Sequence, residues 1–150
     1  MAHVHRYTTT LDWTGATGEG YDSYTRDHRA SGIDLSADPY FRGSPERANP
    51  EELLVMAASS CQLLSFLAIC ARARIDIRSY HDEAEGVMPE DDKPHRITRI
   101  VLRPRIEVAS DTAEERLQRY VGLAHDECYI ANSLKTEVVV EATFVRVDEA

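Results

Sequence analysis

The strongest helix signal in the chain lies between Asn49 and Arg74, in the sequence NPEELLVMAASSCQLLSFLAICARAR. Asn49 suits an N-cap, and Pro50 suits the first helical position because its missing N–H has no helical partner there. Glu52 stands three residues after the cap, as in a capping box. These signals predict a helix from Pro50 to about Arg74. Its interior is apolar on nearly all sides, which is typical of a central helix covered by other elements.

The residues before this helix predict three strands and a loop. Apolar and polar residues alternate from His5 to Trp13, a pattern typical of a half-buried strand. Tyr21–His28 is rich in Tyr and Thr and predicts a second strand, and Ile33–Leu35 predicts a short third one. From Ser36 to Ala48 the composition shifts to Asp, Pro, Gly, Ser and Arg. A loop of this length tends to be functional or mobile.

The residues after the helix predict two strands, a helix, a helical turn and a final strand. The two strands are Ile75–Val87 and Ile97–Val108, and the helix spans Thr112 to about His125. The turn lies around Cys128–Leu134, and Glu137–Val147 is rich in valine, which favours a strand. The order of strands, long helix, strands, helix and strand indicates an α+β fold, with sheet and helices segregated.

Length and composition limit the class of protein. With 150 residues, of which 29% are charged and 43% hydrophobic, the chain has the balance of a single soluble globular domain covering 1–150. The formal net charge of -9 repels polyanions, so neither nucleic acid nor an anionic membrane surface is an expected partner. The apolar stretch Leu53–Ala71 contains three serines and a glutamine, which favours a buried helix over a membrane span.

The cysteines set the compartment and the candidate chemistry. An odd number of three cysteines and a polar, His-rich start of the chain disfavour a secreted disulfide scaffold, so a cytoplasmic location is expected. Cys61 and Cys70 are nine residues apart on the predicted helix. They therefore face opposite ways, roughly 13 Å apart along the axis, and cannot pair. Cys70 stands in an apolar run and is interpreted as a small buried hydrophobe.

Cys61 and Cys128 each leave two interpretations open. Small and polar side chains flank Cys61 in an otherwise apolar helix, which suits either a core residue or a reactive thiol. Cys128 is placed to begin a helical turn, where backbone N–H groups favour a thiolate, although the acidic residues before it could raise its pKa.

Taken together, these features resemble the OsmC/Ohr family, the osmotically inducible and organic hydroperoxide resistance proteins. The resemblance is carried by Asn49-Pro50-Glu51-Glu52-Leu53-Leu54, by Cys61 ten residues after Glu51, and by Cys128 67 residues further on. It covers nearly the whole chain and implies antiparallel sheets packed around a long central helix, in an intertwined homodimer. Members of the family often have a proline directly after the second cysteine, whereas Tyr129 follows Cys128 here.

The resemblance implies a thiol peroxidase that reduces organic hydroperoxides without metal or haem. Cys61 would attack the peroxide and become a sulfenic acid, Cys128 would close a disulfide with it, and an external dithiol would reduce that disulfide. In the family an arginine held by a glutamate activates the reactive cysteine, and the glutamate matches Glu51. Arg42, in the loop before the helix, and Arg26 are both candidates for the arginine, with Arg42 favoured by its place on that loop.

The spacing of Glu51 and Cys61 bears on the number of chains in the site. On one continuous helix the two residues are about 15 Å apart. Either the helix breaks between them, or Glu51 serves the Cys61 of a second subunit, as the family resemblance implies.

Metal binding, phosphate binding and serine hydrolysis fit this sequence less well. His125-x-x-Cys128 and His81-Asp82 have donor atoms for a metal, but no second closely spaced pair of soft ligands accompanies them. The glycines form no phosphate-binding loop, and no serine stands in a G-x-S-x-G elbow. The alternative that stays open is a non-enzymatic dimer of the same fold that binds an apolar small molecule between its subunits.

Overall fold

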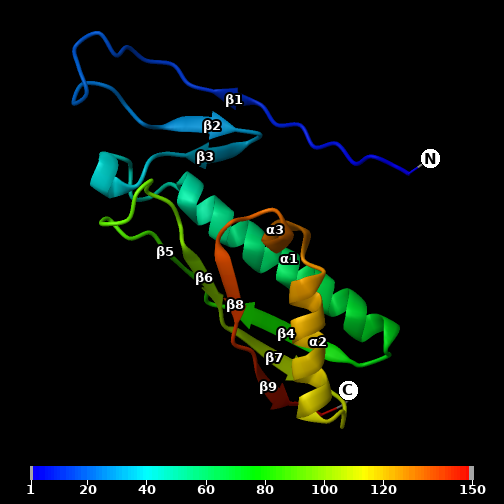
Figure 1. Ribbon diagram of the computed structural model, residues 1–150. Coiled ribbons are helices and arrows are strands. Elements are labelled where there is room, and N and C mark those ends of the chain that lie inside the picture. The colour runs from blue at the N-terminus through cyan, green and yellow to red at the C-terminus, as the bar shows by residue number, and fades with distance from the viewer. Residues whose placement is uncertain (1, 149–150) are drawn as a thin grey trace. The chain divides into compact units, whose positions relative to one another are not determined.

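The computed structural model describes residues 2–148, and the chain divides into two compact units. The first ends at Leu53 and the second begins at Leu54. Figure 1 labels the helices and strands of both units. The single domain over 1–150 expected from the sequence stays a prediction.

The first unit contains one small antiparallel sheet in the order β1-β2-β3. Its strands are Leu11–Asp12, His28–Ala30 and Ile33–Leu35. The third strand, Ile33–Leu35, has the predicted bounds and is confirmed. The loop that follows it contains the 3-10 helix η1, Pro39–Phe41.

Two strands predicted for this unit differ from the structure: the first is much shorter than predicted, and most of the second is not a strand. Of the expected strand His5–Trp13, only Leu11–Asp12 pairs with β2, and its residues are exposed. The expected strand Tyr21–His28 starts as turns and bends, and only His28 joins the sheet. Arg26 explains this difference, because its guanidinium donates to the carbonyls of Tyr24 at 2.5 Å and Tyr21 at 2.6 Å and so curls the segment.

The long helix α1 spans Pro50–Arg72, which confirms the predicted helix. Its start has the reciprocal bonds of a capping box. The Glu52 N–H donates to Asn49 Oδ1 at 2.9 Å, and the Asn49 N–H donates to Glu52 Oε1 at 3.3 Å. Two of the N–H groups that a helix start leaves without helical partners are satisfied in this way.

Two three-stranded sheets form the second unit. One has the order β4-β7-β9, with strands Ile77–Asp82, Pro104–Val108 and Thr143–Arg146. The other has the order β5-β6-β8, with strands Glu85–Val87, Arg99–Leu102 and Glu137–Val140. β4 pairs with β7 and β5 with β6 in antiparallel fashion, whereas β8 and β9 join β6 and β7 in parallel.

Each of the three long strands predicted for this unit is split into two shorter strands. The second of them breaks between Leu102 and Pro104, where proline has no N–H to donate to a ladder. The Arg103 N–H at the break donates instead to the Asp82 carboxylate at 2.7 Å. β7 pairs with β4 and β6 pairs with β5, so one sheet lies on either side of the break.

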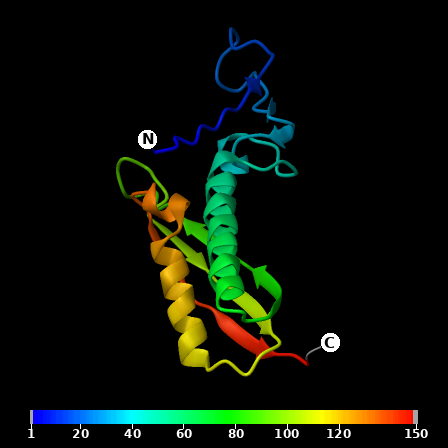
Figure 2. The same ribbon diagram turned by 90° about the vertical axis from the view of Figure 1, so that its right-hand side faces the viewer.

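The core of the second unit lies between the helices and the strands. Figure 2 shows α1 and α2, Glu114–Asp126, side by side on one face of the strands. Buried residues of α1, α2 and β7 form one cluster: Phe66, Ile69, Cys70, Leu117, Val121, Ala124, Ile106 and Val108. The short helix α3, Tyr129–Asn132, follows α2 and confirms the predicted helical turn. The fold is therefore α+β, as the sequence predicts.

α1 is less covered than its composition predicts. The buried residues of this helix are Ala58, Gln62, Phe66, Ile69 and Cys70. Met56 and Leu64 are 49% and 63% exposed. By length and composition α1 would also suit a membrane span, a test that the core helix of a soluble protein passes as well.

Candidate active site

The structure brings the thiols of Cys61 and Cys128 together. Cys61 lies in the middle of α1 and is half-buried, whereas Cys128 directly precedes α3 and is buried. The two thiols lie close enough for Cys61 to raise the pKa of Cys128, and both are free. A dithiol pair is thus formed by residues 67 positions apart in the sequence.

Cys128 is the N-cap of α3. Its Sγ accepts a hydrogen bond from the N–H of Ala131 at 3.5 Å, and the N–H of Ile130 lies close enough to lower its pKa. Burial and the neighbouring Cys61 thiol raise the pKa of Cys128, and the two N–H groups lower it. The pKa of the Cys128 thiol lies above its usual value, so at neutral pH this thiol needs a proton acceptor before it can attack.

Cys70 does not belong to the dithiol. It is buried in the cluster between α1, α2 and β7, which confirms its interpretation as a packing residue. Burial raises the pKa of Cys70 to about 11, and Arg116 opposes that shift.

This pKa predicts how Cys70 reacts with alkylating agents. In a Cys61→Ser/Cys128→Ser variant, Cys70 is protonated at neutral pH, so we expect slow alkylation whose rate rises about tenfold per pH unit until pH approaches 11. The measurement is the rate of iodoacetamide incorporation by mass spectrometry as a function of pH. A rate that levels off near pH 8.5, the ordinary value of a free cysteine, would contradict the assignment.

Two polar side chains of β4, Tyr80 and Asp82, lie near Cys128 or contact α1, and the sequence did not single them out. The Ser59 hydroxyl, two residues before Cys61, donates to the Asp82 carboxylate at 2.5 Å. The Tyr80 hydroxyl lies close enough to Asp82 and Cys128 to feel their charges. The usable signal in the sequence was the spacing of two between Tyr80 and Asp82, which puts them on one face of a strand.

Arg42 and Arg26, the candidate activating residues, lie in the first unit. Arg42 has a left-handed backbone with φ 70° at the end of η1, and its Nε is 2.7 Å from the Asp22 carboxylate. The Arg26 guanidinium lies 3.7 Å from the ring centroid of Tyr24. Since these residues and Cys61 lie in different units, their roles stay predictions.

Glu51 lies in the first turn of α1. This helix continues without a break from Pro50 to Arg72, so one of the two possibilities drawn from the sequence, a break before Cys61, is wrong. On a continuous helix, ten residues correspond to a rise of about 15 Å.

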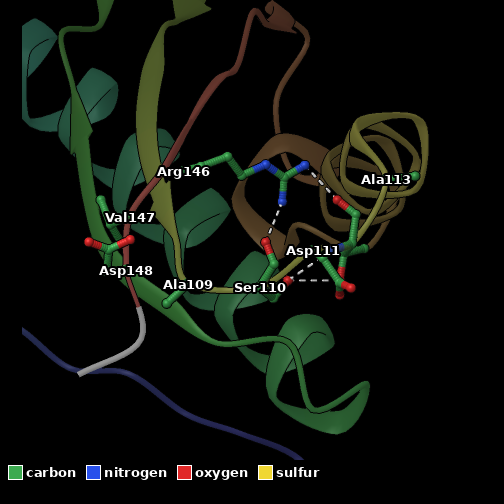
Figure 3. A pocket seen from close by; sticks show the side chains of 8 residues that line it. Ala109, Ser110, Asp111, Ala113, Arg146, Val147 and Asp148 are labelled. Carbon is green, nitrogen blue, oxygen red and sulfur yellow. Dashed lines mark hydrogen bonds between the residues drawn. The ribbon is translucent and has the colours of Figure 1, made fainter.

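A separate pocket of about 630 Å³ lies at the other end of α2. It is lined by residues 109–113 and 146–148. Arg146 crosses it and donates to the carbonyls of Ser110 at 2.8 Å and Thr112 at 2.5 Å, as Figure 3 shows. No predicted site residue lines this pocket.

Potential metal ligands do not gather within residues 2–148, where no group of three or more His, Cys, Asp or Glu side chains could hold an ion. His125 and Cys128 share a backbone bond, from the Cys128 N–H to the His125 carbonyl at 3.2 Å.

Comparison with known proteins identifies the family. The family model described as OsmC-like protein matches residues 43–143, two thirds of the chain. This chain belongs to the OsmC-like family. The matched range includes both cysteines of the dithiol and Glu51, and it leaves out Arg42 and Arg26.

Other OsmC-like proteins share the fold over almost the whole chain. An OsmC-like protein of unknown function from Vibrio cholerae is 33% identical, with a TM-score of 0.84, and the match covers 93% of this chain and 100% of that one. The organic hydroperoxide resistance protein OhrB of Bacillus subtilis is 15% identical, with a TM-score of 0.58, covering 93% and 98%.

A further sequence match is the uncharacterized protein YmaD of Bacillus subtilis, 28% identical over 91 residues. This match covers 61% of this chain and 58% of YmaD, so it spans less than two thirds of that relative.

Proposed function

We propose that this OsmC-like protein is a thiol-dependent peroxidase that reduces organic hydroperoxides through Cys61 and Cys128. The proximity of the two thiols is the observation that carries the proposal. Family membership supports it, and so does the fold shared with proteins named for organic hydroperoxide resistance.

The proposed reaction begins with the Cys61 thiolate attacking the distal oxygen of the hydroperoxide. An S–O bond forms, the O–O bond breaks, and the released alkoxide takes a proton to become an alcohol. Cys128 then attacks the sulfenic sulfur, so that an S–S bond forms and water leaves. An external dithiol reduces the disulfide by exchange and is itself oxidised. The proposal requires neither metal nor haem.

We further propose that the working unit is a homodimer in the cytoplasm. The apolar side chains of Met56 and Leu64, exposed on α1 within its unit, would be covered by a second subunit. In such a dimer Glu51 of one chain would serve Cys61 of the other, together with Arg42 or Arg26, because Glu51 lies too far along α1 from its own Cys61.

A count of free thiols tests the function. The reduced protein is treated with one equivalent of cumene hydroperoxide, and we expect two of the three thiols per chain to disappear within minutes. We also expect this bulky apolar hydroperoxide to react faster than hydrogen peroxide, since leucine and phenylalanine side chains surround Cys61 in the α1 sequence. Retention of all three thiols would refute the peroxidase and favour the non-enzymatic dimer that binds an apolar small molecule.

A further inference from the structure

Gln62 brings a polar amide into the buried face of α1. Its side chain is 1% exposed and directly follows Cys61 in the sequence. The Gln62 Nε2 donates to the main-chain carbonyl of Val121 on α2 at 3.2 Å, and this bond is buried. It joins the two long helices, which lie side by side in Figure 2. The other buried residues of α1 carry no amide or charge: Ala58, Phe66, Ile69 and Cys70.

The cover of α1 changes at Gln62. Ala58, about one turn before it, belongs to a cluster that extends to α3. Phe66, about one turn after it, belongs to the cluster formed with α2. Cys128 stands between α2 and α3 in the chain. Gln62 therefore ties α1 to the helix that leads into the second thiol.

Main-chain hydrogen bonds continue from α2 to Cys128. The Glu127 N–H at the end of α2 donates to the Leu123 carbonyl at 3.0 Å. The Cys128 N–H donates to the His125 carbonyl at 3.2 Å. Since the main chain is bonded up to this cysteine, a shift of α2 along α1 would move the second thiol relative to the first.

Packing alone does not account for a glutamine at this place. Within residues 2–148, Gln62 Oε1 is buried without a hydrogen-bond partner. An unpaired buried acceptor lowers stability, so an apolar side chain of similar volume would fill the space at no loss of stability. Apolar contact has no direction, whereas a hydrogen bond has a preferred length and angle. The amide thus adds a defined placement of α2 on α1.

We propose that Gln62 is a positioning residue for the dithiol, which acts through α2 by fixing where Cys128 stands relative to Cys61. Its bond is to the main chain of α2 and not to a thiol. The inference rests on the proposed function, because it concerns closure of the Cys61–Cys128 disulfide. Reactions between held groups are sensitive to placement, and a misplacement of about 1 Å can cost about 10²-fold.

The test measures how readily the dithiol closes, without any peroxide. The reduced full-length protein is equilibrated with reduced and oxidised glutathione at neutral pH in the absence of air. Two protein thiols are oxidised to one disulfide, and one oxidised glutathione is reduced to two glutathione thiols. Acid quench, alkylation and mass spectrometry give the fraction of Cys61–Cys128 disulfide and hence the equilibrium constant.

The test variant is Gln62→Met, which removes the amide and keeps the length of the side chain. The matched control is Gln118→Met, because Gln118 of α2 also donates its Nε2 to a main-chain carbonyl, that of Ala142, at 3.1 Å. That bond joins α2 to the segment between β8 and β9 instead of to α1. Urea unfolding of the reduced proteins at one fixed protein concentration measures stability in parallel.

We expect the equilibrium constant of Gln62→Met to fall about tenfold, which corresponds to a rise of about 30 mV in the reduction potential of the disulfide. Its urea midpoint should stay at or above that of the wild type, because the unpaired acceptor is gone. Gln118→Met should keep the equilibrium constant within about twofold. A residue that served packing alone would instead lower the urea midpoint and leave the potential unchanged.

An equilibrium constant of Gln62→Met within about twofold of the wild type would overturn the inference, whatever its stability. An equal fall in Gln118→Met would overturn it as well, because the effect would then belong to α2 as a whole. If Gln62→Met does not fold, Gln62→Leu takes its place. Failure of both to fold would overturn the inference by showing that the amide serves the fold itself.

Consumption of cumene hydroperoxide by the same wild-type sample separates this inference from the proposed function. A wild type that closes its disulfide with glutathione but consumes no hydroperoxide refutes the proposed function, and the fall in Gln62→Met would still support the positioning role. A wild type that consumes hydroperoxide while Gln62→Met closes normally keeps the function and overturns the inference.

Discussion

The Cys61→Ser variant is expected to lose hydroperoxide reduction, with turnover at least about 10³-fold below that of the wild type. A serine hydroxyl is not ionised at neutral pH and forms no sulfenic acid, so neither the first attack nor the disulfide can follow. Turnover is measured as consumption of cumene hydroperoxide with an excess of dithiol. In the single-equivalent thiol count, this variant should keep both of its remaining thiols.

The matched control for this prediction is Cys70→Ser, on the same helix and nine residues away. Cys70 is buried against α2 and β7 and has a pKa of about 11, so its replacement should leave turnover within about twofold. Retention of more than about a tenth of the wild-type activity in Cys61→Ser would place the reactive thiol elsewhere. An equal loss in both variants would point to a general loss of folding.

The helix that carries Cys61 could be predicted because its signals are local. Asn49, Pro50 and Glu52 act on N–H groups within one turn, and the structure has the reciprocal bonds that this spacing predicts. The start of α3 at Cys128 is local in the same sense, since the cap bonds the N–H of Ala131 three residues later.

The first unit was predicted less well because its strands depend on partners. The alternation from His5 to Trp13 fits a strand, but only Leu11 and Asp12 find partners, in β2. Aromatic residues favour strands on average, yet Tyr21 and Tyr24 pack around the Arg26 side chain instead. The residue pattern does not show that the Arg26 side chain will bond the carbonyls of Tyr21 and Tyr24, which a strand would use for its ladder.

The candidate site also combines features that the sequence predicts with features that depend on how distant segments pack. The spacing of Glu51, Cys61 and Cys128 identified the dithiol through a family resemblance, and the structure places the two thiols near each other. The sequence could not show that Tyr80 lies near Cys128 or that Asp82 bonds α1, because both depend on how β4 packs in the fold. The bond between Ser59 and Asp82 joins residues 23 positions apart, and no local pattern encodes it.

The Phe66→Ala variant is expected to have the largest effect on stability, lowering the free energy of unfolding by about 3–5 kcal/mol. Phe66 is fully buried, and its ring packs against Tyr80 and Phe144 at centroid distances of 6.2 and 6.3 Å. Removing the ring leaves a cavity between α1 and the sheet β4-β7-β9. The loss is large against a typical total of about 5–15 kcal/mol, and urea unfolding at one fixed protein concentration measures it.

Phe66→Leu is the control, because it keeps most of the buried volume and should cost less than about 1.5 kcal/mol. A cost below about 1 kcal/mol for Phe66→Ala would mean that the core closes over the missing ring, contrary to the close packing seen around it.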